Sequence, residues 1–250
     1  MKVALVHDWL NGMRGGERCL EALCELYPDA PIFTLFYVKG SLSPSIERHR
    51  IVPSLLSYFP FVPNLYRYYL PLFPFLIQTF DLRDYDLILS SSHCVAKGVK
   101  VPPHAYHLSY IHTPMRYVWD QYDAYFGQGR CSKIQQAAMA ILRRRLQQWD
   151  VQSNAHVHGF IANSYNVAER IQRHYGRTAC VVYPPVDWQS FQVSHSHEGF
   201  YLMVTAFAPY KKVDLAIEAA NELGFPLKII GHGQDEKRLK QMAGPILFRA

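Results

Sequence analysis

Short apolar runs alternate along the chain with segments of helical periodicity. Several of the apolar runs carry hydrophobic residues on both sides of the pleat, which is typical of a parallel sheet covered by helices on each face. The runs predict strands at Val3–Val6, Ile32–Phe36, Leu87–Leu89, Tyr106–Ile111, Phe160–Ala162 and Cys180–Val182. The chain is therefore predicted to be an α/β protein with a doubly wound, Rossmann-like architecture.

Two segments interrupt this alternation. Pro53–Phe80 is rich in proline and aromatic residues, and a long helical pattern covers about Ser132–His156. The prolines exclude a single membrane-spanning helix in the first segment. Two interpretations of it stay open: helices that cover the sheet, or an interfacial surface that docks near lipid with help from Arg48, Arg50 and Arg67.

A polar, turn-rich stretch divides the chain. It follows Tyr183–Asp187 and includes Ser194–Gly199, where a linker is expected. We therefore predict an N-terminal Rossmann-like domain over residues 1–193 and the start of a second one over residues 194–250. The second domain is predicted to contain strand Tyr201–Thr205, helix Lys212–Leu223, strand Leu227–Ile230 and a helix near Glu236–Met242. A unit with only two parallel strands is too small to bury both faces of its sheet. This domain is therefore expected either to be incomplete or to pack on the first domain as a lobe.

Composition and charge narrow the classes of protein. Hydrophobic residues make up 49% of the 250 residues and charged residues 18%, which excludes a disordered chain. Scattered cysteines without a C-x-x-C pair favour reduced thiols and no structural zinc; they are Cys19, Cys24, Cys94, Cys131 and Cys180. The apolar start is too short for a signal peptide, so a cytoplasmic location is expected. The net charge of +6 favours phosphate-bearing partners or an anionic membrane, whereas no nucleic-acid motif accompanies it.

Adjacent glycines mark the first candidate site. Gly15 and Gly16 precede the helical pattern Arg18–Leu26, directly after the first predicted strand. Glycine lets a ligand approach the backbone, and free N–H groups at a helix start favour an anion by about 0.3–1 kcal/mol. The turn matches neither the G-x-G-x-x-G pattern nor the P-loop. It predicts a diphosphate site, with a flexible turn as the alternative.

Two further candidates follow predicted strands. His112 and Arg116 come directly after Tyr106–Ile111, at the strand end where open α/β sheets place their ligands. There His112 suits a sugar hydroxyl or phosphate, and Arg116 suits an anion. Lys211 and Lys212 follow the first strand of the second domain and suit phosphate oxygens, with a solvated helix start as the alternative. Together the glycine and lysine turns would bound one cleft.

Six ordered motifs carry a resemblance. They are Val6–Trp9 with Gly15–Glu17, Ser90–His93, His112–Tyr117, Ala162–Ser164, Tyr183–Asp187, and Tyr210–Asp214 with Gly231–Gly233. In these motifs the chain resembles the family 4 glycosyltransferases, enzymes with two Rossmann-like domains (the B-type fold) that use a nucleotide-sugar donor and retain anomeric configuration. The H-T-P-M-R-Y form is most similar to bacterial enzymes of O-antigen and exopolysaccharide synthesis, several of which transfer mannose from GDP-mannose.

The resemblance implies a role for each matching residue. Gly15, Gly16, Lys211 and Lys212 would bind the donor diphosphate, with His112 and Lys211 as catalytic residues. The sugar or acceptor would be bound by Asp8, His112, Arg116, Asn163 and Ser164. It further implies a lipid-linked or polysaccharide acceptor, peripheral association with the inner face of the membrane, and no metal or other cofactor.

Two departures from the family pattern limit these expectations. Ala206 stands where many relatives carry an arginine, and the E-x7-E segment of the family has no counterpart before residue 250. The second domain is therefore expected to be truncated and transfer activity to be weak or absent. Two other functions stay open: a non-catalytic remnant or half of a split enzyme that binds saccharide or a partner, and a nucleotide-sugar epimerase of the same fold.

Overall fold

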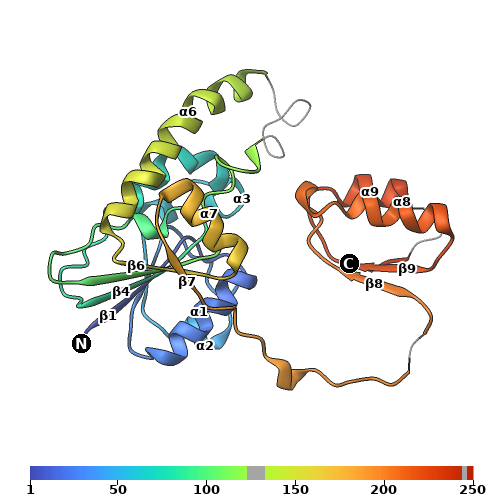
Figure 1. The fold of residues 1–250 in the computed structure, drawn as a ribbon, viewed down its shortest axis with the longest axis horizontal. Coiled ribbons are helices and arrows are strands. Elements are labelled where there is room, and N and C mark those ends of the chain that lie inside the picture. The colour runs from blue at the N-terminus through green and yellow to red at the C-terminus, as the bar shows by residue number, and fades with distance from the viewer. Residues whose placement is uncertain (123–132, 197, 244–246, 250) are drawn as a thin grey trace. The chain divides into compact units, whose positions relative to one another are not determined.

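The computed structural model describes residues 1–122, 133–196, 198–243 and 247–249. It contains two compact units, Met1–Val186 and Asp187–Ala250. Each unit is built on a parallel sheet with helices against it (Figure 1). The α/β, Rossmann-like architecture predicted from the alternating pattern is thus confirmed.

Seven strands form the sheet of the first unit within its described residues, in the order β3-β2-β1-β4-β5-β6-β7. All adjacent pairs are parallel. The strands are β1 (Val3–His7), β2 (Ile32–Thr34), β3 (Ile51–Pro53), β4 (Leu87–Ser92), β5 (Tyr106–Ile111), β6 (Gly159–Ala162) and β7 (Ala179–Val181). β4 is buried along its whole length, as expected for a central parallel strand.

Helices cover both faces of this sheet. They are α1 (Gly15–Leu26), α2 (Pro44–Glu47), α3 (Val62–Leu65), α4 (Phe73–Ile77), α6 (Lys133–Gln152) and α7 (Tyr165–Tyr175). Figure 1 shows α1 and α2 on one side and α3, α6 and α7 on the other. Alternation along β1 explains the two layers, because Leu5 packs with the α1 and α2 residues while Ala4 and Val6 pack with residues of α3, α4 and α6.

The Pro53–Phe80 segment forms short helices instead of a regular element. It contains the 3-10 helices Leu55–Tyr58 and Tyr66–Leu72 in addition to α3 and α4. Proline limits each piece, since the ring removes a backbone donor and clashes with the preceding turn. Among the described helices, none combines the length and apolar character that crossing a bilayer requires.

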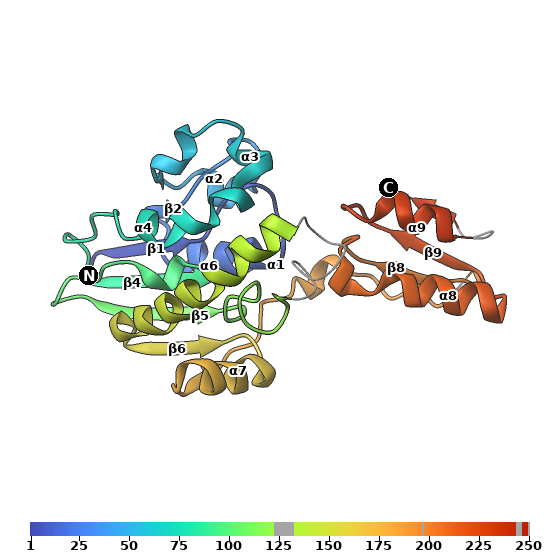
Figure 2. The ribbon, with the colours of Figure 1, turned by 90° about the horizontal axis from the view of Figure 1, so that it is seen from above.

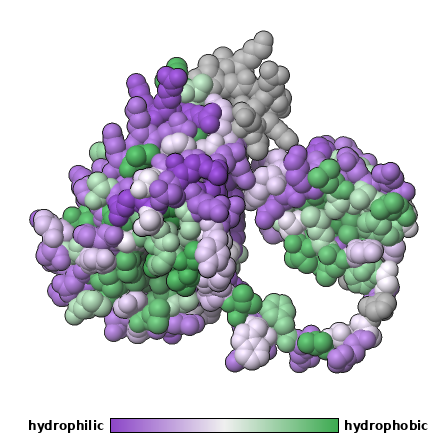
Figure 3. Space-filling view, in the orientation of Figure 1, coloured by the Kyte–Doolittle hydropathy of each residue, from purple (hydrophilic) through white to green (hydrophobic). Residues whose placement is uncertain are grey.

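The second unit has a three-stranded parallel sheet within its described residues, ordered β10-β9-β8. Its elements are β8 (Tyr201–Val204), α8 (Val213–Leu223), β9 (Leu227–Ile230), α9 (Glu236–Met242) and β10 (Leu247–Arg249). The prediction of two strands is wrong, because β10 pairs with β9. The helices bury Ile217, Ile229 and Leu239, whereas Leu202 and Val204 are exposed. Figure 3 shows apolar residues gathered on this unit beneath its helices.

The cysteines that the structure describes carry free thiols. Cys19, Cys24 and Cys94 are buried and Cys180 is exposed. Burial raises the pKa of Cys24 to about 12, so that thiol stays protonated at neutral pH. Cys131 lies outside the described residues.

Candidate functional site

The carboxyl ends of β1, β4 and β5 meet the N-terminus of α1. His7 ends β1 and is paired in register with Ser91 of β4, and His112 follows β5. A Cβ atom at Gly16 would lie 3.4 Å from His7 Cε1 and 3.7 Å from His112 Nε2. The first turn of α1 therefore lies directly against both rings, and its first N–H groups have no acceptor within the helix. Two predicted site residues, Gly16 and His112, are brought together here.

Hydrogen bonds fix His112 from two sides. Its Nε2 lies 2.8 Å from Ser91 Oγ. Asn163, at the end of β6, donates from Nδ2 to the backbone oxygen of His112 at 3.1 Å. Ser164 begins α7 by accepting the Val167 N–H, and its hydroxyl donates to Asn163 Oδ1. Asn163 and Ser164 thus hold the backbone of the site, and their contact with a sugar stays a prediction.

His93 and His112 are uncharged at neutral pH. Burial, and then the positive charge of neighbouring groups, lowers the pKa of His93 to about 3. Burial followed by the neighbouring His93 and His7 lowers the pKa of His112 to about 3 as well. A neutral imidazole has one N–H donor and one acceptor nitrogen. His112 is therefore suited to hydrogen bonding a hydroxyl group, and it supplies no positive charge for a diphosphate.

Glu17 places a carboxylate in the first turn of α1. Its Oε1 lies 3.8 Å from His7 Nε2, and its Oε2 accepts the Arg14 N–H at 3.1 Å. Burial by itself would raise the pKa of Glu17, but the adjacent His7 outweighs burial and the pKa is lowered. Glu17 therefore remains ionised beside the helix N-terminus, where a negative charge is favourable.

Asp8 is committed to the backbone that follows β4. Its carboxylate is fully buried and accepts four backbone N–H bonds of 2.6–2.9 Å, from His93, Cys94, Val95 and Ala96. His93 Nδ1 lies 3.1 Å from the same carboxylate. Asp8 thus holds the turn that positions His93, while its predicted contact with the sugar stays a prediction.

A buried ion pair ties the same turn to the helices behind it. Lys97 Nζ lies 3.0 Å from Asp150 Oδ1 of α6. Trp119 Nε1 and the Tyr175 hydroxyl donate to Asp150 Oδ2 at 2.8 and 2.9 Å. Burial lowers the pKa of Lys97, although Asp150 opposes the shift. The turn between β4 and β5 is consequently held from both ends, by Asp8 and by Asp150.

Arg116 lies in the turn after β5, half-buried. Its charge contributes to the lowered pKa of His93, which places it within electrostatic reach of that ring. Arg170 of α7 binds Thr113 at 2.6 Å and pairs with Asp120, so this turn is also anchored to α7. Contact between Arg116 and an anionic ligand stays a prediction.

Lys211 and Lys212 lie in the second unit and are exposed. Lys211 ends a 3-10 helix (Pro209–Lys211), and Lys212 adopts a left-handed φ of 51° just before α8. Two glycines that follow β9 pack against the loop between β8 and Lys211. A Cβ at Gly231 would lie 1.8 Å from Thr205 O, and one at Gly233 would lie 2.6 Å from Phe207 O. Both glycines are therefore required for the close packing of this loop.

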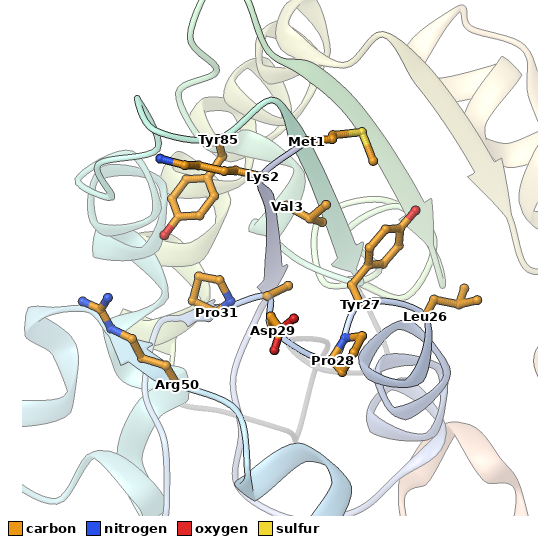
Figure 4. Close-up of a pocket in the computed structure, with 11 residues that line it drawn as sticks. Met1, Lys2, Val3, Leu26, Tyr27, Pro28, Asp29, Pro31, Arg50 and Tyr85 are labelled. Carbon is orange, nitrogen blue, oxygen red and sulfur yellow. The ribbon is translucent and has the colours of Figure 1, made fainter.

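A separate cavity of about 510 Å³ opens at the other end of the strands. Figure 4 shows Lys2, Tyr27, Arg50 and Tyr85 among the side chains that line it. Lys2 precedes β1 and Arg50 precedes β3, so the cavity is at the amino edge of the sheet. The predicted site residues do not line it.

Four residues of the site lay within quoted motifs but had no predicted role: His7, Glu17, Ser91 and His93. Each is at, or directly after, the carboxyl end of a strand or in the first turn of α1. Their polar character in these places could have indicated a role in the site, because parallel strands bring their carboxyl ends to one edge of the sheet.

Comparisons with known proteins agree with this architecture. No curated protein matches the sequence. Anabaena HepE in complex with UDP is similar over 100% of this chain and 70% of its own, with a TM-score of 0.65 and 16% identity. A mutant S. aureus TarM in complex with Fondaparinux, alpha-GlcNAc-glycerol and UDP is similar over 100% of this chain and 77% of its own, with a TM-score of 0.59 and 10% identity. These likenesses show the fold, and it is the B-type fold of glycosyltransferases. The model of Glycosyltransferase Family 4 matches residues 13–190, more than half of the chain, and the chain therefore belongs to that family.

Proposed function

We propose that this protein is a retaining glycosyltransferase that moves a hexose from a nucleotide-sugar donor to a lipid-linked or polysaccharide acceptor. Family membership supports the class of reaction. HepE and TarM each hold UDP in their structures, which supports a nucleoside diphosphate as the leaving group. The H-T-P-M-R-Y form at His112–Tyr117 favours GDP-mannose as the donor. In this proposal the reaction takes place in the cytoplasm, at the inner face of the membrane, and needs no bound metal.

One observation carries the proposal: the first turn of α1 lies against His7 and His112 with no side chain between them. The free N–H groups of Gly15 and Gly16 are suited to diphosphate oxygens. Beside them, neutral His112 is suited to a sugar hydroxyl. Lys211 and Lys212 supply positive charge for the departing diphosphate, so that the transition state is stabilised more than the bound substrate.

Gly16→Ala is expected to weaken nucleotide-sugar binding by about 10- to 100-fold, the loss that accompanies one hydrogen bond to a charged group. The new methyl group would occupy the space between α1 and the rings of His7 and His112. Alanine favours a helix more than glycine does, so Tm should not fall. Calorimetric titration with GDP-mannose and with UDP-glucose measures the affinity, and the wild-type protein should prefer GDP-mannose.

Gly15→Ala is the matched comparison. A Cβ at Gly15 meets no atom within 4 Å, so its methyl group points into open space and the loss of affinity should be smaller than at Gly16. If Gly16→Ala binds both nucleotide sugars as tightly as the wild type, the diphosphate does not lie at α1. If the wild-type protein binds UDP-glucose more tightly than GDP-mannose, the proposed donor is wrong, but the proposed diphosphate site at α1 is unaffected.

In a version of the protein that carries out sugar transfer, Lys211→Ala is expected to lower kcat/KM by about 10- to 1000-fold, the range for one charged contact to the leaving group. Lys237→Ala, which removes an exposed lysine from α9 of the same unit, is the control. Mass-resolved detection of the glycosylated acceptor gives the rates. Equal rates for the two variants would remove Lys211 from the mechanism.

A further inference from the structure

His93 directly follows β4, and β4 lies between β1 and β5 in the sheet (Figure 2). The centroid of its ring lies 6.1 Å from that of His7, at the end of β1, and 6.3 Å from that of His112, after β5. The charges of Glu17 and Arg116 both act on the ring. His93 is therefore surrounded by groups of the candidate site that come from β1, α1 and the turn after β5.

A carboxylate and an indole hold the His93 ring in place. Asp8 Oδ2 lies 3.1 Å from Nδ1 of the ring, and it also accepts the backbone N–H of His93 at 2.6 Å. The ring of Trp9, which is buried, packs edge-on against the imidazole, with the two centroids 4.4 Å apart and the planes at 86°. A ring that is fixed in this way loses little conformational entropy when a ligand binds.

The contact with Asp8 determines which ring nitrogen carries the hydrogen. Burial lowers the pKa of His93 to about 3, so the ring is neutral and has one N–H donor and one lone-pair nitrogen. The Asp8 carboxylate accepts four backbone N–H bonds, and it therefore faces Nδ1 as an acceptor too. A carboxylate repels a lone pair, so Nδ1 carries the hydrogen and Nε2 carries the lone pair.

Nε2 of His93 has no hydrogen-bond partner in the described part of the chain. The side chain is 16% exposed, and Nε2 is not among the unpartnered nitrogens that are sealed from solvent. Both ring nitrogens of His7 are sealed in that way. The Nε2 of His112 faces the Ser91 hydroxyl, which is able either to donate or to accept. Of these three rings, His93 is therefore the one that presents a defined acceptor nitrogen to a ligand.

An acceptor nitrogen selects the chemistry of its ligand. A phosphate oxygen carries lone pairs and negative charge and is repelled by Nε2, whereas a hydroxyl group donates to it. Saccharides supply such hydroxyl groups in the proposed reaction. Asp8 is not available for this contact, because its carboxylate is fully buried and its four N–H bonds occupy about four lone-pair positions.

We infer that His93 is a saccharide-binding residue whose Nε2 accepts a hydrogen bond from a sugar hydroxyl, and that Asp8 is a positioning residue that fixes the ring and its tautomer. The sugar contact that the family resemblance gives to Asp8 thus passes to His93. The inference rests on the proposed function for the source of the saccharide, which is the donor hexose or the acceptor. It divides the site by chemistry: N–H groups of α1 face the diphosphate, and the lone pair of His93 faces a hydroxyl.

Nitrogen-15 NMR of the imidazole rings tests the tautomer in the wild-type chain without any ligand. At pH 7, His93 should carry its hydrogen on Nδ1 and have a bare Nε2. The signals of this ring are assigned by their disappearance in His93→Asn. A hydrogen on Nε2, or a charged ring, would overturn the inference.

Ligands added to the same sample identify the source of the hydroxyl. A shift of the His93 Nε2 signal with GDP-mannose beyond that with GDP assigns the donor hexose. A shift with methyl α-mannoside, methyl α-glucoside or methyl α-galactoside in the presence of GDP assigns the acceptor. No shift with any of these sugars, or a larger shift with inorganic phosphate, would overturn the inference. The amides of Gly15 and Gly16 report the diphosphate separately: if GDP leaves them unchanged while a glycoside shifts His93, the proposed diphosphate site fails and the inference stands.

Two substitutions separate saccharide binding from structural support. His93→Asn keeps an N–H donor for Asp8 but has no acceptor at the Nε2 position, so affinity for the saccharide that shifts Nε2 should fall about 2- to 10-fold, the value of one hydrogen bond, with little change in Tm. His93→Gln keeps an amide oxygen near the Nε2 position and loses the donor, so it should recover part of the affinity at a lower Tm. His104→Asn, at an exposed ring, is the control. Equal saccharide affinity in His93→Asn and His104→Asn would overturn the inference.

Discussion

Acidification from pH 6.5 to pH 4.5 is expected to remove most of the stability of the first unit. His93, His107 and His112 each have a pKa lowered to about 3, mainly by burial. In the unfolded chain a histidine has a pKa of about 6.5. Below that pH the unfolded state takes up protons that the folded state excludes, so stability falls with falling pH until the folded pKa is reached.

The expected slope is steep. Each of the three imidazoles costs about 1.4 kcal/mol per pH unit, or ~4 kcal/mol per unit together. Because histidine in the unfolded chain is already half protonated at pH 6.5, acidification to pH 4.5 removes ~7 kcal/mol, which is comparable to the whole stability of a typical domain. The site therefore depends on neutral imidazoles for its folding as well as for its hydrogen bonds.

Urea unfolding at a series of pH values, followed by tryptophan fluorescence, measures this slope, because Trp9, Trp119 and Trp149 lie in the first unit. His107→Gln removes one buried imidazole and should reduce the slope by about one third. His104→Gln, at an exposed ring, is the control and should leave it unchanged. A stability that stays constant between pH 6.5 and 5 would contradict the neutral state of the buried histidines.

Asp8→Ala is expected to lower the free energy of unfolding of the first unit by about 4 kcal/mol or more. The change leaves four backbone N–H groups, those of residues 93–96, without their acceptor. A buried donor without a partner costs about 1–3 kcal/mol, and these four backbone N–H groups lose the same charged acceptor together. The turn that carries His93 should therefore open before the rest of the unit.

Denaturant titration at pH 7.5 gives the comparison. Asp8→Asn keeps one oxygen acceptor and should fall between wild type and Asp8→Ala. Asp84→Ala removes an exposed carboxylate and is the control. If Asp8→Ala and Asp84→Ala unfold at the same urea concentration, the carboxylate does not hold the turn, and its predicted contact with the sugar becomes the better account of its role.

Much of the fold was predictable because local patterns determine it. Strand Tyr106–Ile111 and helix Glu236–Met242 have the limits that the apolar periodicity indicates. β3 (Ile51–Pro53) was missed, since three residues that include a proline give no strand pattern and depend on pairing with β2. β10 was missed for the same kind of reason, because it is specified by its pairing with β9.

The site was predictable where strand ends and helix starts determine it, and less so where distant segments do. Placement of His112 after β5 and of Gly16 in α1 follows from the rule that parallel strands present their carboxyl ends together. The four partners of Asp8 lie 85 to 88 residues further along the chain, so nothing near Asp8 reveals them. Likewise, the lowered pKa of His112 arises from burial and from His93 and His7, which only the folded sheet brings near it.

Hydrogen exchange with and without nucleotide sugar tests the central claim most directly, namely that the donor diphosphate binds at the N-terminus of α1 beside His112. We predict that GDP-mannose slows exchange of the amides of Gly15, Gly16 and Glu17, which have no acceptor within the helix, and leaves the cavity around Tyr27 and Arg50 at the opposite edge unchanged. Slowed exchange at that cavity instead, or none at α1 with any nucleotide sugar that binds, would contradict the account.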